Sequence, residues 1–242
     1  SKMNVKYAEV RFAPNKHLAK NLTLDDVVIS VINGMNKANV ETGIMGGIIL
    51  SMMRGDSKED NIRVINLAQK YLKKGVVAID LAGAEAIYPT IDYIDLFRYA
   101  KIKGIPFTIH AGEAAGVESI KAALDAGAKR IGHGIRAIDD EAIQKIIIDK
   151  QVLLEVCMTS NYQTEAVKGK HPIEKLYNNG IKISINTDND TVSNIDINKE
   201  YTKILNETDL TMDDLGKCNK ESIDYISVSY THLRAHETLS DG

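Results

Sequence analysis

The chain has 242 residues, of which 44% are hydrophobic and 26% are charged, and these fractions are typical of a globular protein with a sizeable core. Its formal net charge of -3 and its pI near 6.1 provide no basic field for nucleic acid or for an anionic membrane. Composition therefore disfavours a disordered chain, a nucleic-acid-binding module and a membrane-surface protein, and it favours a small-molecule partner.

The cysteine content and the pattern of apolar residues bear on the cellular compartment of the protein. Cys157 and Cys218 are the only cysteines, and their spacing supports neither a disulfide framework nor a thiolate metal site. No stretch approaches the roughly 20 apolar residues of a membrane span, and no signal peptide precedes Val5. We expect a cytoplasmic protein, and the sequence indicates no oligomeric state.

Strands and helices are predicted to alternate along the chain. Apolar runs and alternation predict strands over 5–12, 46–53, 76–81, 105–110, 130–133, 152–156 and 181–185. Helical spacing predicts helices over 23–39, 57–74, 94–103, 117–126, 139–149, 172–179, 199–206 and 212–226. Thr23 and Ser57 are the expected N-caps of the first two helices, and Gly75 is expected to stop the second.

This alternation predicts an α/β fold, either a TIM-type (β/α)8 barrel or an open doubly wound sheet. Seven strands are predicted, whereas a closed barrel of this type has eight, so we expect the barrel to be incomplete, with its first strand preceding Val5. Residues 1–226 are predicted to form one partial-barrel domain. Residues 227–242 lack apolar periodicity and are expected to be an unrelated or poorly ordered tail.

Polar side chains gather at the predicted carboxyl ends of the strands, where parallel α/β proteins bind their ligands. They are Arg11, Asp80, His110, Glu113, His133, Ser160, Asp188 and Asn189. His110 and Asp188 are suitable zinc ligands, because zinc accepts imidazole nitrogen and carboxylate oxygen. Glu113 is then placed to act as an acid or base beside a metal that lowers the pKa of its water.

Other residues carry weaker signals. Asp80 either contacts a substrate or bridges neighbouring strands, and Arg11 and Arg54 are expected to pair with interior carboxylates. Gly83 offers an accessible backbone N–H, which a tight turn would explain equally well. The histidines of the segment 232–236 lack the glutamate of a zinc-protease helix, and the glycines at 43–47 lack the lysine of a phosphate-binding loop.

Several motifs together resemble the adenosine deaminases. They are EVRFAP at 9–14, MRGD at 53–56, DLAG at 80–83, HAGE at 110–113, GHG at 132–134, TSN at 159–161 and NTDN at 186–189. The resemblance runs in order from about Val5 to about Ile226. It implies a zinc-dependent (β/α) barrel of the metallo-dependent hydrolase type. The implied reaction is the deamination of adenosine and 2'-deoxyadenosine to the corresponding inosine nucleoside and ammonia, in purine salvage.

The resemblance also implies a role for each site residue. His110 and Asp188 are the implied ligands of one Zn2+ ion. Glu113 is implied to protonate ring nitrogen N1, and His133 to orient and help deprotonate the zinc-bound water. Gly83 is implied to donate its N–H to N3, and Asn189 to face N7.

This sequence differs from the family's pattern in its expected zinc ligands. The family's first strand carries a His-x-His pair of further zinc ligands, and no such pair precedes Val5. We therefore expect this chain to be a fragment that is inactive or impaired by itself. Two alternatives remain open: a deaminase of adenine or of an N6-substituted purine nucleotide, and a catalytically silent barrel fragment with residual purine binding.

Overall fold

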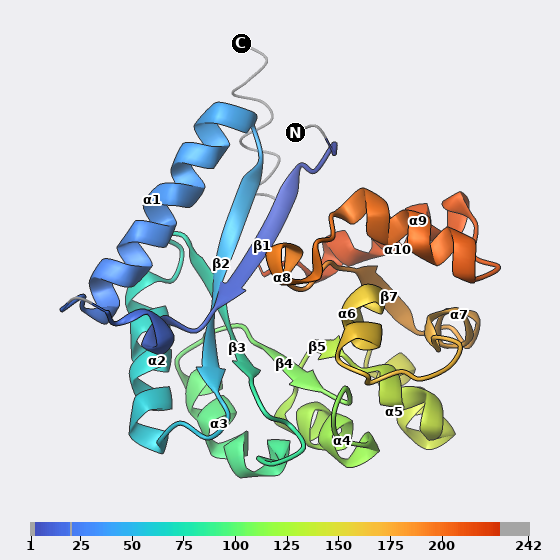
Figure 1. Ribbon diagram of the computed structural model, residues 1–242. Coiled ribbons are helices and arrows are strands. Elements are labelled where there is room, and N and C mark those ends of the chain that lie inside the picture. The colour runs from blue at the N-terminus through green and yellow to red at the C-terminus, as the bar shows by residue number, and fades with distance from the viewer. Residues whose placement is uncertain (1–2, 20, 228–242) are drawn as a thin grey trace. The chain divides into compact units, whose positions relative to one another are not determined.

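The computed structural model describes residues 3–19 and 21–227. Their packing divides them between two compact units, each of which is described by itself. Unit 1 takes the described residues of Ser1–Gly83, Leu96–Phe107 and Ile226–Gly242, and unit 2 takes Ala84–Asp95 and Thr108–Tyr225. Each unit contains one parallel sheet (Figure 1). In the described part of the chain, no helix is both long enough and apolar enough to span a membrane.

Unit 1 has a three-stranded sheet in the order β1-β2-β3, formed by β1 (Tyr7–Phe12), β2 (Met45–Met53) and β3 (Val76–Ala82). Two long helices, α1 (Leu24–Thr42) and α2 (Lys58–Tyr71), pack against β2, and α2 also packs against β3 (Figure 1). Most of β2 and nearly all of β3 are buried, which explains why both read as continuous apolar runs rather than as alternating strands.

Local capping in unit 1 follows the predictions, with one correction. Thr23 forms a capping box with Asp26, and Ser57 caps α2, as predicted. The expected end of α2 at residue 74 is wrong, because the helix ends at Tyr71. Leu72 is extended and pairs with Val76, and Lys73 adopts a left-handed conformation with φ 62°, so the chain turns into β3 earlier than expected.

A buried carboxylate links the three strands of unit 1. Asp80 on β3 is fully buried and accepts a hydrogen bond from Ser51 on β2 at 3.4 Å. Nη1 of Arg11 on β1 lies 3.8 Å from Oδ1 of Asp80. The strand-bridging role of Asp80 and the pairing of Arg11 with an interior carboxylate are therefore confirmed.

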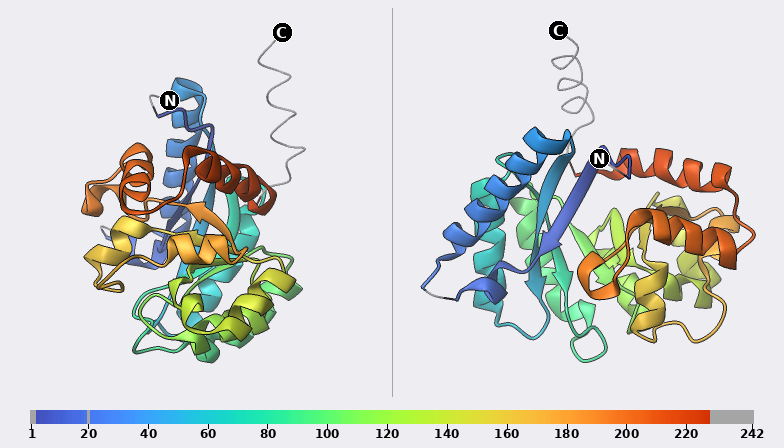
Figure 2. Two further views of the ribbon diagram at one scale, coloured as in Figure 1. Left: turned by 90° about the vertical axis from the view of Figure 1, so that its right-hand side faces the viewer. Right: turned by 45° about the horizontal axis from the view of Figure 1, so that its top comes forward.

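Unit 2 has a four-stranded parallel sheet in the order β4-β5-β6-β7. Its strands are β4 (Thr108–Ala111), β5 (Arg130–His133), β6 (Leu153–Val156) and β7 (Lys182–Ile185). Its longer helices are α4 (Val117–Ala126), α5 (Glu141–Asp149), α9 (Ile197–Glu207) and α10 (Met212–Ser222), with the shorter α6 (Met158–Gln163), α7 (Ile173–Asn178) and α8 (Asp190–Ser193). Helix α10 packs along β7 (Figure 2). Helix α3 (Ile94–Ile102) begins in unit 2 and continues in unit 1.

Two further expectations need correction. Strand β4 begins at Thr108 rather than at Ile105: Pro106 has no N–H to donate to a ladder, and Phe107 forms an isolated bridge with Ile79. The segments after β6 and β7, which are not among the predicted helices, contain the short helices α6 and α8. Both are brief, and polar residues of low helix propensity dominate them, so periodicity could not reveal them.

The seven strands of the described residues agree with the predicted number and with the predicted parallel α/β class. Ser227 is described, and its backbone N–H donates to Glu9 Oε1 at 2.7 Å. The rest of the predicted tail, residues 228–242, lies outside the described residues. The proposed domain boundary near residue 226 stays a prediction.

Candidate active site

Five of the six predicted site residues belong to unit 2, where they lie at the carboxyl ends of its parallel strands. His110 is in β4, and Glu113 follows that strand. His133 is the last residue of β5, and Asp188 and Asn189 follow β7. The sixth, Gly83, belongs to unit 1 and is described there.

Two imidazole rings meet where β4 and β5 end. His110 pairs in register with Gly132, and the ring centroids of His110 and His133 lie 5.2 Å apart. A side chain at position 132 would place its Cβ 3.2 Å from both Cα and Cγ of His110, so glycine makes room for the His110 ring. His133 is buried and has a φ of 62°, a conformation that costs energy for a residue with a Cβ.

Glu113 points its carboxylate at His133. Oε2 of Glu113 lies 3.4 Å from Nε2 of His133, while Oε1 accepts hydrogen bonds of 3.0 Å from Asn161 Nδ2 and from Thr164 Oγ1. The side chain of Glu113 keeps 19% of its surface exposed. One oxygen is thus fixed by two neutral donors, and Oε2 is the oxygen placed to exchange a proton with a ligand.

The hydrogen bonds around Asn161 assign the proton positions. The backbone N–H of Ile173 donates to Nδ1 of His171, so neutral His171 carries its proton on Nε2. That Nε2–H faces Asn161 Oδ1 at 3.2 Å, which orients the Asn161 amide. Asn161 Nδ2 therefore points at Glu113 and, at 3.0 Å, at Nδ1 of His133. His133 accepts at Nδ1 and carries its proton on Nε2, facing Glu113.

His171 stays neutral because it is buried. Burial, with smaller effects of Lys203 and His133, lowers the pKa of His171 from 6.5 to about 4. The neutral form is the one that both accepts from Ile173 and donates to Asn161. Because His171 stays neutral near pH 7, the hydrogen bonds around Asn161 keep a single arrangement.

We predict that acid weakens the fold through His171. In the unfolded chain His171 gains a proton near pH 6.5, whereas the folded state resists it down to about pH 4. The unfolded state binds more protons in that window, so the free energy of unfolding should fall as pH decreases, by about 3 kcal/mol in total. Urea unfolding of the full-length protein between pH 7 and pH 4 measures this. His171→Gln keeps a donor for Asn161 and should reduce the dependence, and an equal slope in both proteins would contradict the assignment.

Asp188 is held by its neighbour across the sheet. Ser160 is buried and donates to Asp188 Oδ2 at 2.7 Å. Asp188 has a φ of 60°, so it shares with His133 a left-handed backbone at the end of a strand. Strain of this kind tends to collect at functional sites, because surrounding structure must hold it in place.

The two predicted substrate contacts have clear local roles. Asn189 Oδ1 caps α8 by accepting from the N–H of Val192 at 3.0 Å, so its Nδ2 is the group that could reach a ring nitrogen. Gly83 follows β3 in unit 1 with a φ of 102°, which explains the glycine on conformational grounds.

Sequence reasoning missed the groups that support the site. His171, Asn161 and Thr164 complete the network around Glu113, and no pattern in the sequence predicts that role for them. Glu200 on α9 is fully buried and accepts from the backbone N–H of Thr159 at 3.0 Å and from its hydroxyl, which fixes the start of α6. The signals that the sequence gave for this part of the molecule were the TSN motif and the strand-end position of Ser160.

The metal-binding capacity of the chain is partial. His110 and Asp188 supply the donor types that zinc accepts. In the part of the chain that the structure describes, however, no three His, Cys, Asp or Glu side chains are grouped so that they could hold one metal ion. The donors therefore fit part of a zinc site.

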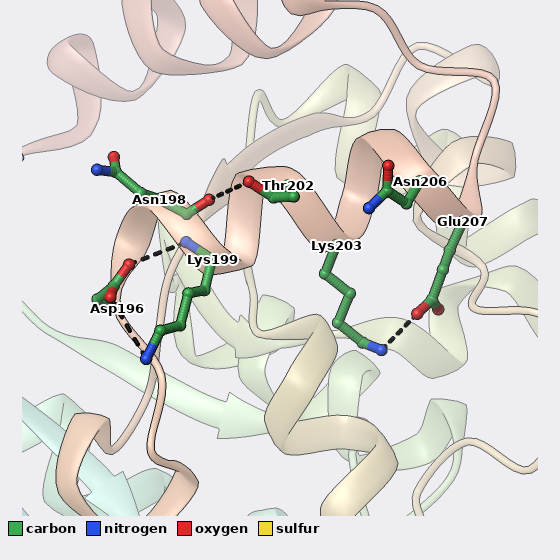
Figure 3. Close-up of a pocket in the computed structure, with 7 residues that line it drawn as sticks. All are labelled: Asp196, Asn198, Lys199, Thr202, Lys203, Asn206 and Glu207. Atoms are coloured by element: carbon green, nitrogen blue, oxygen red, sulfur yellow. Dashed lines mark hydrogen bonds and ion pairs between the residues drawn. The ribbon is translucent and has the colours of Figure 1, made fainter.

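A surface hollow of about 490 Å³ lies along α9, and the residues that bond to Glu113 are not among those that line it. Figure 3 shows its residues along α9, with Lys203 paired to Glu207 and with Asp196, at the start of the helix, accepting from the Lys199 N–H. These charged groups already pair with one another. The hollow offers no chemistry comparable to that around Glu113.

Comparison with known sequences places this arrangement in context. The sequence model of a family described as adenosine deaminase matches residues 1–238. The adenosine deaminase of Haemophilus ducreyi is 43% identical over 224 residues, which cover 90% of this chain and 65% of that protein. The chain thus spans slightly less than two thirds of that relative's length.

Solved structures match the fold. A zinc-bound amidohydrolase from Burkholderia ambifaria has a TM-score of 0.89 at 21% identity, covering 97% of this chain and 67% of that one. The Arabidopsis N6-mAMP deaminase has a TM-score of 0.87 at 23% identity, covering 98% and 73%. At such identities the likeness concerns the fold, and it confirms the TIM-type (β/α) barrel class.

Proposed function

The chain belongs to the adenosine deaminase family, and we propose that the protein it comes from hydrolyses adenosine and 2'-deoxyadenosine to the inosine product and ammonia, in cytoplasmic purine salvage. The observation that carries the proposal is the Glu113 carboxylate, which lies 3.4 Å from His133 and is fixed by two neutral donors. A carboxyl group and an imidazole side by side at strand ends suit proton transfer to and from a purine ring.

We propose that His110 and Asp188 are two ligands of a zinc ion. When bound, zinc supplies Lewis acidity, which lets water lose a proton near neutral pH. Further ligands are expected from residues other than the described ones, because the described residues contain no group of three and the chain covers 65% of the relative's length. The chain by itself is then expected to be inactive or impaired.

The proposed proton transfers use the two site residues described above. Water oxygen adds to C6 of the purine while the proton on Glu113 passes to N1, so the ring stays neutral as C6 becomes tetrahedral. His133 orients the attacking water and, by donating its Nε2–H to the water oxygen, helps the water to lose a proton, which passes to the Glu113 carboxylate. Glu113 then gives this proton to the amine as the C6–N bond breaks and ammonia leaves, and the C6 hydroxyl proton returns to Glu113 as the C6 carbonyl forms.

Two further contacts would orient the base. We propose that Gly83 donates its backbone N–H to N3 and that Asn189 Nδ2 faces N7. Both ring nitrogens accept hydrogen bonds, and both proposed partners are donors. The capping bond to Val192 uses Asn189 Oδ1 and leaves the Nδ2 group for this role.

The direct test is an assay of the full-length protein with zinc. Adenosine absorbance should shift to that of inosine, and a folded, zinc-loaded protein that leaves adenosine unchanged would refute the proposal. Adenine and an N6-substituted purine nucleotide belong in the same assay as alternative substrates. Faster turnover of either would replace the assigned substrate, and absence of turnover with all of them would favour a silent barrel with residual purine binding.

We predict that Ser160→Ala weakens zinc binding by about 10- to 100-fold, as is common when a ligand loses the group that orients it. Ser160 is the donor that fixes Asp188 Oδ2 at 2.7 Å. Competition of the full-length protein with a chelator of known affinity gives the Kd for zinc. Ser30→Ala on the exposed surface of α1 is the matched control, and an unchanged Kd in Ser160→Ala would argue against Asp188 as a ligand.

A further inference from the structure

A buried carboxylate outside the reaction network holds the loop that carries Glu113. Glu85 is 5% exposed and belongs to unit 2, in the segment that precedes the 3-10 turn η2 (Thr90–Tyr93). It lies 28 residues before Glu113 in the sequence. Nothing in the proposed proton transfers uses it.

Glu85 accepts hydrogen bonds from four successive backbone N–H groups. Oε1 accepts from Gly112 at 2.6 Å, and Oε2 accepts from Glu113 at 3.1 Å, Ala114 at 2.8 Å and Ala115 at 3.1 Å. The Ser119 hydroxyl, at the start of α4, also donates to Oε1. Five neutral donors thus converge on one carboxylate.

The loop can present these donors because of Gly112. Its φ of 75° turns the chain so that successive N–H groups point to one side, a geometry that favours an anion. A Cβ at this position would lie 2.5 Å from the Ile120 side chain, so the turn requires glycine. The apolar packing behind the loop and the carboxylate in front of it therefore fix the same backbone.

Glu85 is ionised in this setting. Burial by itself would raise the pKa of Glu85, but the hydrogen bonds from Ser119 and from the N–H groups of Gly112, Ala115 and Ala114 outweigh it, and the pKa lies below its ordinary value. A charged acceptor strengthens each bond relative to a neutral one. The loop therefore binds its own internal anion.

We propose that Glu85 is the positioning residue for Glu113. Its bond to the Glu113 N–H fixes the backbone from which the Glu113 side chain reaches Asn161, Thr164 and His133. Because acid-base catalysis depends on placement within fractions of an ångström, Glu85 acts on the reaction through Glu113 without touching the substrate. This inference rests on the proposed function for the role of Glu113.

The test compares Glu85→Gln with the wild type in the full-length, zinc-loaded protein. A glutamine keeps the size but replaces one acceptor oxygen with an NH2 group that faces N–H donors. We expect kcat for adenosine to fall about 10- to 100-fold with KM changed less than about threefold, because ground-state binding does not require the exact carboxylate position. Glu118→Gln is the matched control, since Glu118 is exposed and accepts from the next N–H of the same loop, Gly116, at 3.0 Å.

A double-mutant cycle separates positioning from general stability. If Glu85 acts through Glu113, Glu85→Gln should reduce kcat little further when Glu113→Gln is already present. A general loss of folded structure would instead lower kcat by the same factor with and without Glu113→Gln. Multiplicative effects of the two substitutions would overturn the inference. Ser119→Ala removes one donor and should act in the same direction more weakly, so it serves if Glu85→Gln folds poorly.

Hydrogen exchange makes the result independent of the assay. The amides of residues 112–115 should exchange about 10- to 100-fold faster in Glu85→Gln, as expected when charge-assisted hydrogen bonds are lost. Unchanged exchange would overturn the inference whatever the activity. If the wild type leaves adenosine untouched, the proposed function fails, and faster exchange at these amides would still show that Glu85 holds the loop.

Discussion

Glu113→Gln should lower kcat for adenosine by about 10²- to 10⁴-fold, the range that a positioned general acid or base contributes. Glutamine has the same shape and can still accept from Asn161 and Thr164, which hold Oε1 at 3.0 Å in the wild type. It cannot give a proton to N1. The expected loss is therefore chemical rather than structural, and steady-state kinetics of the full-length protein with zinc measures it.

Zinc content distinguishes this role from that of a metal ligand. Because Glu113 is assigned to proton transfer, the variant should keep its zinc, and its KM should change only a few-fold. Glu141→Gln, which alters an exposed carboxylate in the first turn of α5, should leave kcat unchanged. Loss of zinc in Glu113→Gln would contradict the assigned role, as would wild-type turnover.

The fold class could be predicted because it depends on local patterns. Buried parallel strands read as apolar runs, and the strand ends deliver polar residues to one face, so the sequence predicts that His110, His133 and Asp188 share one site. The rings of His110 and His133 do lie together, and the assignment of Asp188 to the same site stays a prediction. Caps such as Thr23 were predictable for the same reason, since the bond between a side chain and the N3 N–H spans three residues.

The supporting residues could not be predicted, because their partners are distant and carry no sequence signature. Glu85 and Glu200 bind backbone N–H groups 27 and 41 residues away, and every residue except proline has such a group. His171 acts on Glu113 through Asn161. Patterns along the chain indicate which face is apolar, but they do not indicate which buried polar group a loop will meet.

The predictions of helix ends were wrong for a related reason. The apolar spacing of α2 continues past Tyr71, yet Leu72 leaves the helix to pair with Val76. Tertiary pairing overrides local propensity at such ends. Similarly, α6 starts where Glu200 supplies an acceptor for the Thr159 N–H, a stabilisation that its own polar sequence does not provide.

Asn161→Ala should have the second large effect, on stability and on catalysis together. Asn161 is fully buried and bonds to His171, Glu113 and His133. Alanine leaves the Nε2–H of His171 and Nδ1 of His133 without this partner in a buried site. Unsatisfied buried groups cost about 1–3 kcal/mol each, so the free energy of unfolding should fall by about 2–4 kcal/mol, a large share of the 5–15 kcal/mol typical of a domain.

The catalytic part of the effect follows from orientation. Without the Asn161 amide, Glu113 keeps Thr164 as its donor, and His133 loses the group that keeps its proton on Nε2. We expect kcat to fall about 10- to 100-fold below the wild type under conditions where the variant is fully folded. Urea unfolding gives the stability change, and kinetics at a temperature well below the transition gives kcat.

A matched substitution separates the two effects. Asn66→Ala removes an exposed asparagine that accepts from Tyr99 at 3.0 Å, and it should change both quantities little. If Asn161→Ala lost stability while keeping wild-type kcat, the network would be a structural one, and the placement of Glu113 would depend on Thr164 and the loop backbone alone. A fall in both quantities would instead show that one buried amide couples the stability of unit 2 to the proton chemistry at its strand ends.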